Sequence, residues 1–289
     1  MTRKPTLAFA LILSGILLIA AARSAELPAE AYAAAKAARR EAAASIVERL
    51  TKRIDAGDLD DQQLAEAFRN RGVARNDLLD YPAALQDFDR AISIQQVNPQ
   101  YYEDRAIVYL KLRDYAKADT DLDMTLGLDS KRASAYREKG RLAAYQGDFE
   151  RAVPEFRRAI QNSEGEAAIY GVLWLHIALS RAGQGQRTLL QELAGQMNPG
   201  VWPYPVVQMF LGEVTVQAAV EAGGSPIAGQ DLMRKCEAWF YAGEKYLIDG
   251  DLEHAREAFR LAVATDVTDF LEYDWAAREL ERLGGSHRP

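Results

Sequence analysis

A period of 34 residues is the feature that most constrains how this chain of 289 residues can fold. Three similar stretches, "LDYPAALQDFDRAI", "RDYAKADTDLDMTL" and "GDFERAVPEFRRAI", begin at residues 79, 113 and 147, one period apart. Self-similarity at such a period is typical of arrays in which each unit buries its apolar face only against its neighbours. The sequence therefore predicts stacked units that have no core of their own.

Each copy has the pattern of an amphipathic helix. An aspartate opens it, at a position where a side-chain oxygen can accept an unpaired backbone N–H of the first turn. Small and large apolar residues follow at spacings of three and four, as in Ala152, Phe156 and Ala159, and these spacings place them on one helix face. The three aspartates are Asp80, Asp114 and Asp148.

A second helical stretch precedes each copy and is separated from it by a short turn. One column of this stretch holds a small residue, which is glycine in two of the three copies. Because a glycine inside a helix costs about 1 kcal/mol relative to alanine, we expect close contact with the partner helix there. The column consists of Gly72, Ala106 and Gly140. We therefore predict helix–turn–helix units at residues 65–98, 99–132 and 133–166.

The remaining segments extend the array in both directions. A fourth clear unit lies at residues 236–269, where a glycine, an aspartate and a phenylalanine recur in the columns of the first three. Residues 167–235 have room for two degenerate helical repeats. Residues 25–64 are predicted to form amino-terminal helices with a partial repeat. Residues 270–289 are predicted to form a capping helix and a tail, because the end of an array needs a polar outer face.

Two amino-terminal segments stand out by composition. We interpret residues 55–66, "DAGDLDDQQLAE", as a solvated acidic connector, because the run lacks the ligand spacing of a calcium loop. The alanine-rich segment 29–44 favours a helix but has few large apolar residues. We expect this segment to pack on a second copy of the chain, which would make a homodimer.

The composition of the whole chain favours an all-α fold. Valine and isoleucine are sparse, whereas alanine, leucine, glutamate, glutamine and arginine abound. The formal net charge of −7 argues against nucleic acid as a partner, because phosphates need a basic surface. The single cysteine, Cys236, can form neither an intrachain disulfide nor a thiolate metal cluster.

Residues 1–24 have the pattern of a secretory signal peptide. Basic "MTRK" precedes an uncharged stretch, residues 7–22, and small residues follow it. Because this stretch is shorter than the roughly 20 residues that span the hydrocarbon core, we expect cleavage after Ala22 or Ser24 and export to the periplasm. The alternative is an uncleaved leader that anchors the chain to the inner membrane, which would be its only membrane contact.

No catalytic constellation is apparent in the sequence. It contains no nucleophile elbow, no phosphate-binding glycine loop and no dinucleotide fingerprint. Of its three histidines, we interpret His176 as a core residue hydrogen-bonded to backbone, His254 as solvent-facing and His287 as part of the tail. No two of them have the i,i+4 spacing of a zinc site. We therefore predict a chain that is not an enzyme and uses no cofactor or metal.

The helix–turn–helix units resemble the tetratricopeptide repeat (TPR), with an aromatic and a small residue in the first helix and Ala–Phe–Ala in the second. The resemblance implies a superhelical array, an α-solenoid, in which the first helices line a concave groove for a peptide or helix of a protein partner. Val73, Asp104 and Ser134 stand where chaperone-binding members need Asn, Asn and Lys, so the resemblance does not imply recognition of a terminal carboxylate. The groove positions of the family fall on Arg69, Asn70, Val73, Asn76, Glu103, Asp104, Ile107, Lys111, Arg137, Glu138, Arg141 and Tyr145.

The carboxyl-terminal half resembles a narrower family, the NlpI-type periplasmic TPR adaptors. The similarity is most specific in "FLGEVT" and in "EAWFYAGEKYL" with the following "FRLAVATDVTDFLEY". It implies an adaptor that brings murein hydrolases to a cell-envelope protease. Those members carry a lipid-attachment cysteine after the leader, and this chain has none.

Three hypotheses of function follow. The first is an exported, non-catalytic adaptor or scaffold that binds cell-envelope proteins, with a protease or murein hydrolase as the expected partner. The second is a self-assembling structural scaffold held at the inner membrane by the leader. The third is an enzyme whose site, including His176, is hidden in residues 167–235.

Overall fold

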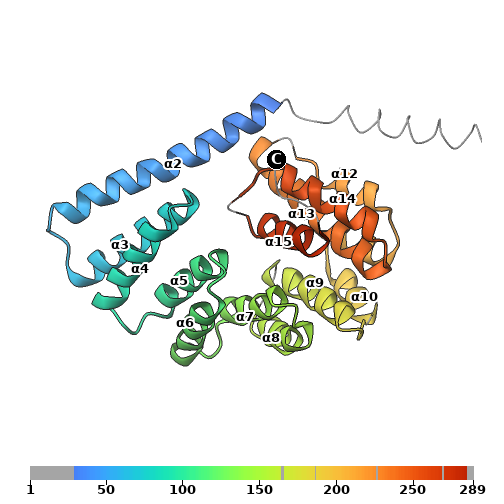
Figure 1. Ribbon diagram of the computed structural model, residues 1–289, viewed down its shortest axis with the longest axis horizontal. Helices are drawn as coiled ribbons and strands as arrows, with labels where there is room; N and C mark the ends of the chain where they lie inside the picture. Colours follow the sequence, from blue (N-terminus) through green and yellow to red (C-terminus); the bar gives the residue numbers. More distant parts are fainter. Residues whose placement is uncertain (1–28, 164–165, 186, 226, 269, 285–289) are drawn as a thin grey trace, which may run out of the picture.

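The computed structural model describes residues 29–163, 166–185, 187–225, 227–268 and 270–284. The predicted leader, residues 1–24, and His287 lie outside these ranges. Within them the chain forms fourteen α-helices and no strand, which confirms the predicted all-α array. The helices follow one another around an open arc (Figure 1).

The three central units are antiparallel helical hairpins. The helix pairs are α3 (Asp61–Asp77) with α4 (Tyr81–Ile94), α5 (Pro99–Lys111) with α6 (Tyr115–Leu128), and α7 (Ala133–Tyr145) with α8 (Phe149–Gln161). Helix α3 begins inside the stretch expected to be a solvated connector, so that interpretation is wrong from Asp61 onward. The reason is local: Asp60 caps α3, and its carboxylate accepts the backbone N–H of Gln63 at 2.8 Å.

The aspartate that opens each second helix is a true N-cap. In every case the carboxylate accepts the backbone N–H three residues later, at 3.0–3.3 Å. These bonds satisfy one of the donors that a helix leaves unpaired at its amino end. The four capping residues are Asp80, Asp114, Asp148 and Asp251.

The small-residue column brings the two helices of each hairpin into close contact. A Cβ atom placed on Gly140 would lie 2.7 Å from the ring of Phe156, and one on Gly72 would lie 2.9 Å from the ring of Phe88. In the fourth unit, a Cβ on Gly243 would lie 2.5 Å from its phenylalanine ring. The predicted packing reason for these glycines is therefore confirmed.

Buried ion pairs recur with the repeat. Arg71 donates two hydrogen bonds to the carboxylate of Asp87, at 2.7 and 3.0 Å, and Arg105 donates two to Asp121, at 2.7 and 2.8 Å. Both members of the second pair lie 34 residues after those of the first. Asp87 is 2% exposed and Asp121 is 3% exposed, so each needs its partner to offset the loss of hydration.

The carboxyl-terminal half holds the largest core. Its helices are α9 (Glu166–Arg181), α10 (Arg187–Gln196), α11 (Tyr204–Leu211), α12 (Val216–Ala222), α13 (Ala228–Asp249), α14 (Leu252–Ala264) and α15 (Leu271–Arg282). Trp174 is its centre: the ring centroid lies 4.6 Å from that of Trp275 and 5.2 Å from that of Phe240. Cys236 is fully buried here, in the interior of α13, because that helix begins eight residues before the predicted unit.

Helix α2 (Ala29–Asp55) bridges the two ends of the arc. Its carboxyl half packs on α3, with Ala43 and Leu50 buried. Its amino half reaches α13, where the Tyr32 hydroxyl donates to Asp231 (Figure 1). The alanine-rich segment that we expected to contact a second copy therefore contacts the far end of the same chain.

The described helices were also compared with the requirements of a membrane span. None of them combines the length and the apolar character needed to cross a bilayer.

Candidate partner-binding surface

The twelve predicted groove residues lie on α3, α5 and α7, the inner helices of the three central units (Figure 1). The structure divides them into three groups with different surroundings. Those of the third unit lie under α15, those of the second are engaged with neighbouring units, and those of the first face α2. Each group offers a different opportunity to a partner.

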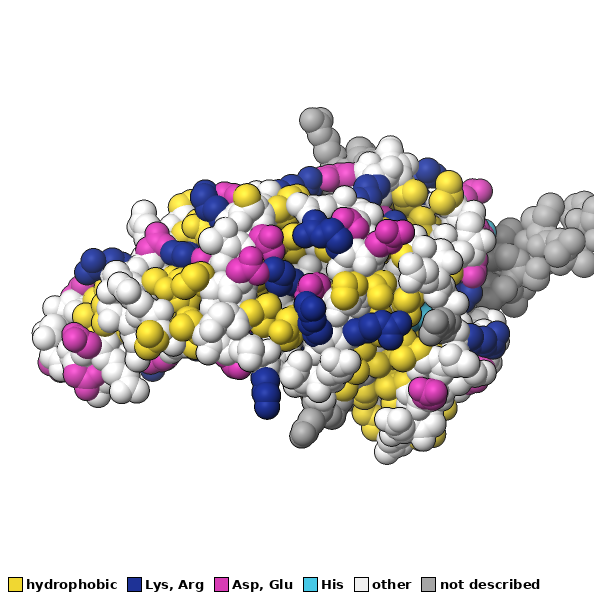
Figure 2. Space-filling view, turned by 90° about the horizontal axis from the view of Figure 1, so that it is seen from below, with side chains coloured by type: hydrophobic (Ala, Val, Ile, Leu, Met, Phe, Trp, Pro, Cys, Tyr) yellow, Lys and Arg dark blue, Asp and Glu magenta, His cyan; other side chains and the backbone are white. Residues whose placement is uncertain are grey.

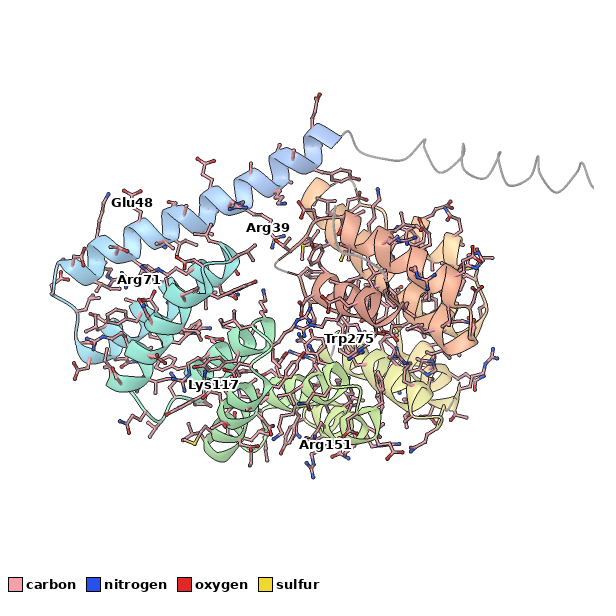
Figure 3. All side chains as sticks on the ribbon, in the orientation of Figure 1. Arg39, Glu48, Arg71, Lys117, Arg151 and Trp275 are labelled. Atoms are coloured by element: carbon pink, nitrogen blue, oxygen red, sulfur yellow. The ribbon has the colours of Figure 1, made fainter. Side chains whose placement is uncertain are left out.

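Helix α15 fills the groove of the third unit. Glu138, Arg141 and Tyr145 are buried, with 3%, 7% and 5% of their surface exposed. The Trp275 ring lies 4.8 Å from the Tyr145 ring, and Figure 3 shows it pointing from α15 toward α7. Arg137, the fourth predicted residue of this unit, is half-buried beside Glu138. The chain's own helix thus occupies the place predicted for a partner.

Two arginines of α15 contact equivalent carbonyl oxygens of successive units. Arg278 donates to the Leu110 carbonyl at 2.9 Å, and Arg282 donates to the Ala144 carbonyl at 3.1 Å. Leu110 and Ala144 are 34 residues apart and lie at the carboxyl ends of α5 and α7. A helix leaves carbonyls unpaired at this end, and its dipole favours a cation there. The inner surface therefore binds a helix through features that repeat along the array.

Buried acidic groups surround the docked helix. Burial raises the pKa of Glu272 to about 7, although the nearby Arg141 and Arg137 favour its charged form. Burial likewise raises the pKa of Glu237 to about 8, and the Glu272 carboxyl adds to this shift. The Trp202 indole N–H and the Tyr170 hydroxyl donate to Glu237. These groups stabilise the fold of this half and are not open to solvent.

His176 lies in the same core. It is 8% exposed, and its ring stands edge-on against Phe210 at 5.1 Å. Its Nδ1 atom has no hydrogen-bond partner among the described residues, so the expected bond from this atom to backbone is absent. Burial lowers the pKa of His176 to about 4, and Lys245 lowers it further. His254 is exposed, as predicted, and contacts Asp251.

The groove residues of the second unit are engaged in contacts between units. Glu103 accepts from Arg132, and Asp104 accepts from Arg69 at 2.6 Å. Ile107 is half-buried, and the Lys111 ammonium lies 6.0 Å from the centroid of the Tyr81 ring. These contacts fix the stacking of units one and two and leave only part of each side chain accessible.

The first unit faces a hollow beneath α2. This hollow, of about 380 Å³, is called here the groove hollow, and it includes three predicted residues, Arg69, Asn70 and Val73. Asn76, the fourth predicted residue, is half-buried, and its Oδ1 atom has no hydrogen-bond partner among the described residues. The other lining residues are Ile46, Arg49, Leu50, Arg53, Ala74 and Asp77.

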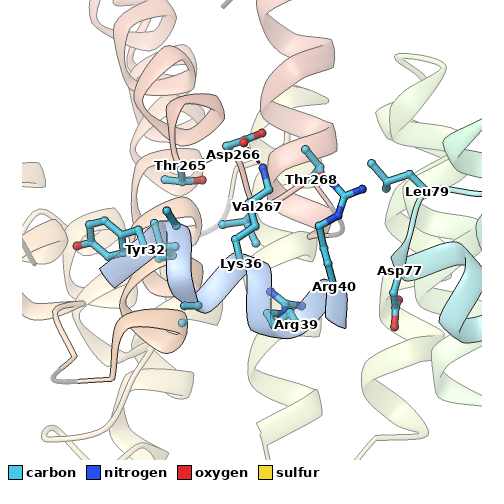
Figure 4. Close-up of a pocket in the computed structure, with 14 residues that line it drawn as sticks. Tyr32, Lys36, Arg39, Arg40, Asp77, Leu79, Thr265, Asp266, Val267 and Thr268 are labelled. Carbon is cyan, nitrogen blue, oxygen red and sulfur yellow. Dashed lines mark hydrogen bonds and ion pairs between the residues drawn. The ribbon is translucent and has the colours of Figure 1, made fainter. Parts of the chain in front are cut away.

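A second hollow lies where α2 reaches the carboxyl-terminal half. This clasp hollow, of about 280 Å³, is enclosed by α2, the end of α3, the start of α13 and the turn between α14 and α15 (Figure 4). Its lining includes Lys36, Arg39 and Arg40 from α2, and Asp77 is shared with the groove hollow. In this region Lys36 pairs with Asp266, and Lys235 donates to the Tyr32 hydroxyl at 2.8 Å.

The surface charges are mixed on the face of the molecule seen from below. Basic, acidic and apolar side chains alternate there, with no broad region of one sign (Figure 2). In the ranges that the structure describes, no three His, Cys, Asp or Glu side chains are placed to hold a metal ion.

Comparison with solved structures identifies the architecture. Yeast Tom70 superposes on 84% of this chain and 60% of its own, with a TM-score of 0.52 and 15% sequence identity. The fold is a tetratricopeptide-repeat array. TPR proteins from Cytophaga hutchinsonii (TM-score 0.48, 15% identity, 82% of this chain and 96% of that one) and Parabacteroides merdae (0.47, 17%, 81% and 99%) are also similar. No known family profile matches the chain.

The TPR resemblance located the groove of the first unit but missed the residues that complete it. Arg40, Arg49 and Arg53 belong to α2, outside the three central TPR units, and line the same hollows. Their sequence signal is a run of basic residues at roughly helical spacing in a chain that is acidic overall. Trp275 and the arginines of α15 were also missed, because only the tertiary structure brings them to the inner surface.

Proposed function

We propose that this protein is an exported, non-catalytic TPR adaptor that binds cell-envelope proteins through the inner surface of its first two units. The observation that supports this most directly is the docking of α15. Units two and three already hold a helix through carbonyl oxygens at repeated positions, with Trp275 packed on Tyr145. The first unit presents the same inner surface without such a helix.

A cell-envelope protease or a murein hydrolase is the proposed partner. This part of the proposal rests on the sequence resemblance to NlpI-type adaptors and on the leader pattern of residues 1–24. Mass spectrometry of the mature amino terminus tests the export step. A terminus at Arg23 or Ala25 is expected, whereas an intact Met1 would favour the inner-membrane anchor.

Site-specific photo-crosslinking in living cells tests the binding surface. A photoreactive residue at Val73, in the groove hollow, should give adducts with envelope proteins. The matched control is Met124, which is 45% exposed on the second helix of the second unit. Adducts at Met124 alone, or at neither position, would argue against the adaptor.

The alternative is a self-assembling scaffold anchored at the inner membrane. The alanine-rich face of α2 supports it, because Ala33, Ala34, Ala37 and Ala38 are exposed there. Light scattering at rising concentration distinguishes the two functions. A species that stays monomeric removes the scaffold and leaves the adaptor.

A further inference from the structure

We propose that the cleft between α2 and the first TPR unit docks an acidic segment of a protein partner, whose carboxylates contact the guanidinium groups of α2. This inference rests on the proposed adaptor function and adds the chemistry of the partner. It differs from the groove contacts of the repeats, because the cations come from a helix outside the three central units.

The hollows beneath α2 form one continuous cleft. Asp77 lines both the clasp hollow and the groove hollow. A third hollow, of about 380 Å³, adjoins the turn between α2 and α3 and shares Leu50, Arg53 and Asn70 with the groove hollow. A segment that lies along α2 could therefore contact all three.

The floor of the cleft is apolar. Leu50 and Ala74 are buried, whereas Ile46, Val73 and Leu79 keep part of their side chains accessible. Aliphatic side chains of a bound segment would cover this surface and remove it from water. An apolar floor of this kind suits a polypeptide better than a polynucleotide, and the net charge of −7 disfavours phosphate polymers.

The walls of the cleft are basic. Three of the six cations in the clasp and groove hollows, Arg40, Arg49 and Arg53, are exposed and pair with no carboxylate in the described part of the chain. Only two carboxylates line these two hollows, and the third hollow adds Asp60 and Glu66. The six cations are Lys36, Arg39, Arg40, Arg49, Arg53 and Arg69, and the two carboxylates are Asp77 and Asp266.

This charge distribution selects the occupant. A concave surface lined by one sign of charge concentrates partners of the opposite sign, and guanidinium groups bind carboxylates with two parallel hydrogen bonds. Lys36 and Arg69 already have carboxylate partners, so the unpaired arginines of α2 remain for the bound segment. Glutamates or aspartates that alternate with aliphatic residues would satisfy both the walls and the floor.

Peptide binding to the purified full chain tests the proposal. The probe is a fluorescein-labelled synthetic peptide of glutamate and leucine at helical spacing, and its counterpart has lysine in place of every glutamate. Fluorescence anisotropy should show saturable binding of the acidic peptide, at least tenfold tighter than binding of the basic one. Binding should weaken as salt is added, because exposed ion pairs are screened.

A triple reversal, R40E/R49E/R53E, should weaken binding of the acidic peptide at least tenfold. The matched control, K131E/R151E/R157E, makes the same change in net charge at exposed positions beyond the cleft. Arg151 points outward from α8, away from the arc (Figure 3). The control should change affinity less than twofold, with helical circular dichroism unchanged in both variants.

Three results would overturn the proposal: equal loss in both variants, no loss in R40E/R49E/R53E, or equal binding of the two peptides. If R40E/R49E/R53E instead abolished an oligomer of the chain, a second copy would be the occupant. The adaptor function is judged separately. Photo-crosslinked partners at Val73 with no acidic-peptide binding would leave that function standing and refute only this inference.

Discussion

The inner surface of the array is covered in two different ways. Over the third unit, α15 brings Trp275 and Leu280, each at most 2% exposed, and the groove closes completely. Over the first unit, α2 brings mainly alanine and arginine, and the hollows stay open. Large apolar side chains turn a covering helix into core, whereas small and charged ones leave a cleft. The comparison teaches that a groove position becomes a binding position only where no such helix reaches it.

The strongest way to break this comparison is to remove the side chain that closes the third unit. Trp275→Ala should lower the free energy of unfolding by about 3–5 kcal/mol, because it leaves a large cavity against Tyr145, Trp174 and Phe240. Denaturant unfolding measures the change. Leu252→Ala, at a position 53% exposed, is the control and should cost below about 0.5 kcal/mol. A small effect of Trp275→Ala would mean that α15 is a removable cover.

The hairpin contact beneath both halves gives the next largest effect. Gly140→Ala should lower the free energy of unfolding by about 1–3 kcal/mol, since its Cβ would overlap the Phe156 ring. The second unit shows the compensation, because Ala106 stands opposite Leu122 there. The double variant G140A/F156L should therefore recover part of the loss in the same denaturant measurement. An additive result would show that the column does not act as a pair.

Acidic groups buried in the carboxyl-terminal half predict a dependence on pH. Glu237 and Glu272 have pKa values of about 8 and 7 in the folded chain, against 4.5 when unfolded. The folded state therefore binds more protons above pH 4.5, and stability falls as the pH rises toward 8. His176, with its pKa lowered from 6.5 to about 4, has the opposite effect, but only below pH 6.5.

Thermal or denaturant unfolding between pH 6.5 and 8 isolates the carboxyl effect. The free energy should fall by up to about 1.4 kcal/mol per pH unit for each buried carboxyl that titrates. Glu237→Gln should flatten this slope, whereas Glu253→Gln, an exposed residue of α14, should not. Stability that rises with pH in this window would refute the assignment.

The repeats and their stacking could be predicted because they depend on local, periodic signals. The N-cap aspartates and the glycine column lie at fixed intervals, and each contact they make is within one hairpin. The position of α15 could not be predicted in this way. Its arginines contact Leu110 and Ala144, more than 130 residues away in the sequence, and no period of the chain encodes that meeting.

The same reason explains the mixed outcome for the candidate site. Arg69, Asn70 and Val73 line a hollow, and Glu138, Arg141 and Tyr145 are buried, although both sets occupy equivalent repeat positions. Helix α2 was predicted as two separate segments, because its alanine-rich half resembles an extension and its apolar half resembles a repeat helix. The unbroken helix, Ala29–Asp55, is what carries arginines over the first unit.

The clasp between α2 and the carboxyl-terminal half gives the smallest expected effect and sharpens the comparison most. Lys36 and Asp266 are 39% and 60% exposed, so Lys36→Ala should change the free energy of unfolding by less than about 1 kcal/mol. A disulfide detects local opening that global stability does not register. A Cβ on Gly229 would lie 4.0 Å from that of Ala35, within the range of a disulfide.

The variant A35C/G229C should therefore cross-link within one chain on mild oxidation, and electrophoresis without reductant measures the rate. Cys236 is fully buried and does not compete for the bond. Adding Lys36→Ala should slow cross-linking, because the amino half of α2 is then held mainly by Tyr32. The single variant A35C should give no intrachain product. An unchanged rate in the Lys36→Ala background would show that the ion pair does not hold the clasp, whereas dimeric product alone would place α2 on a second chain.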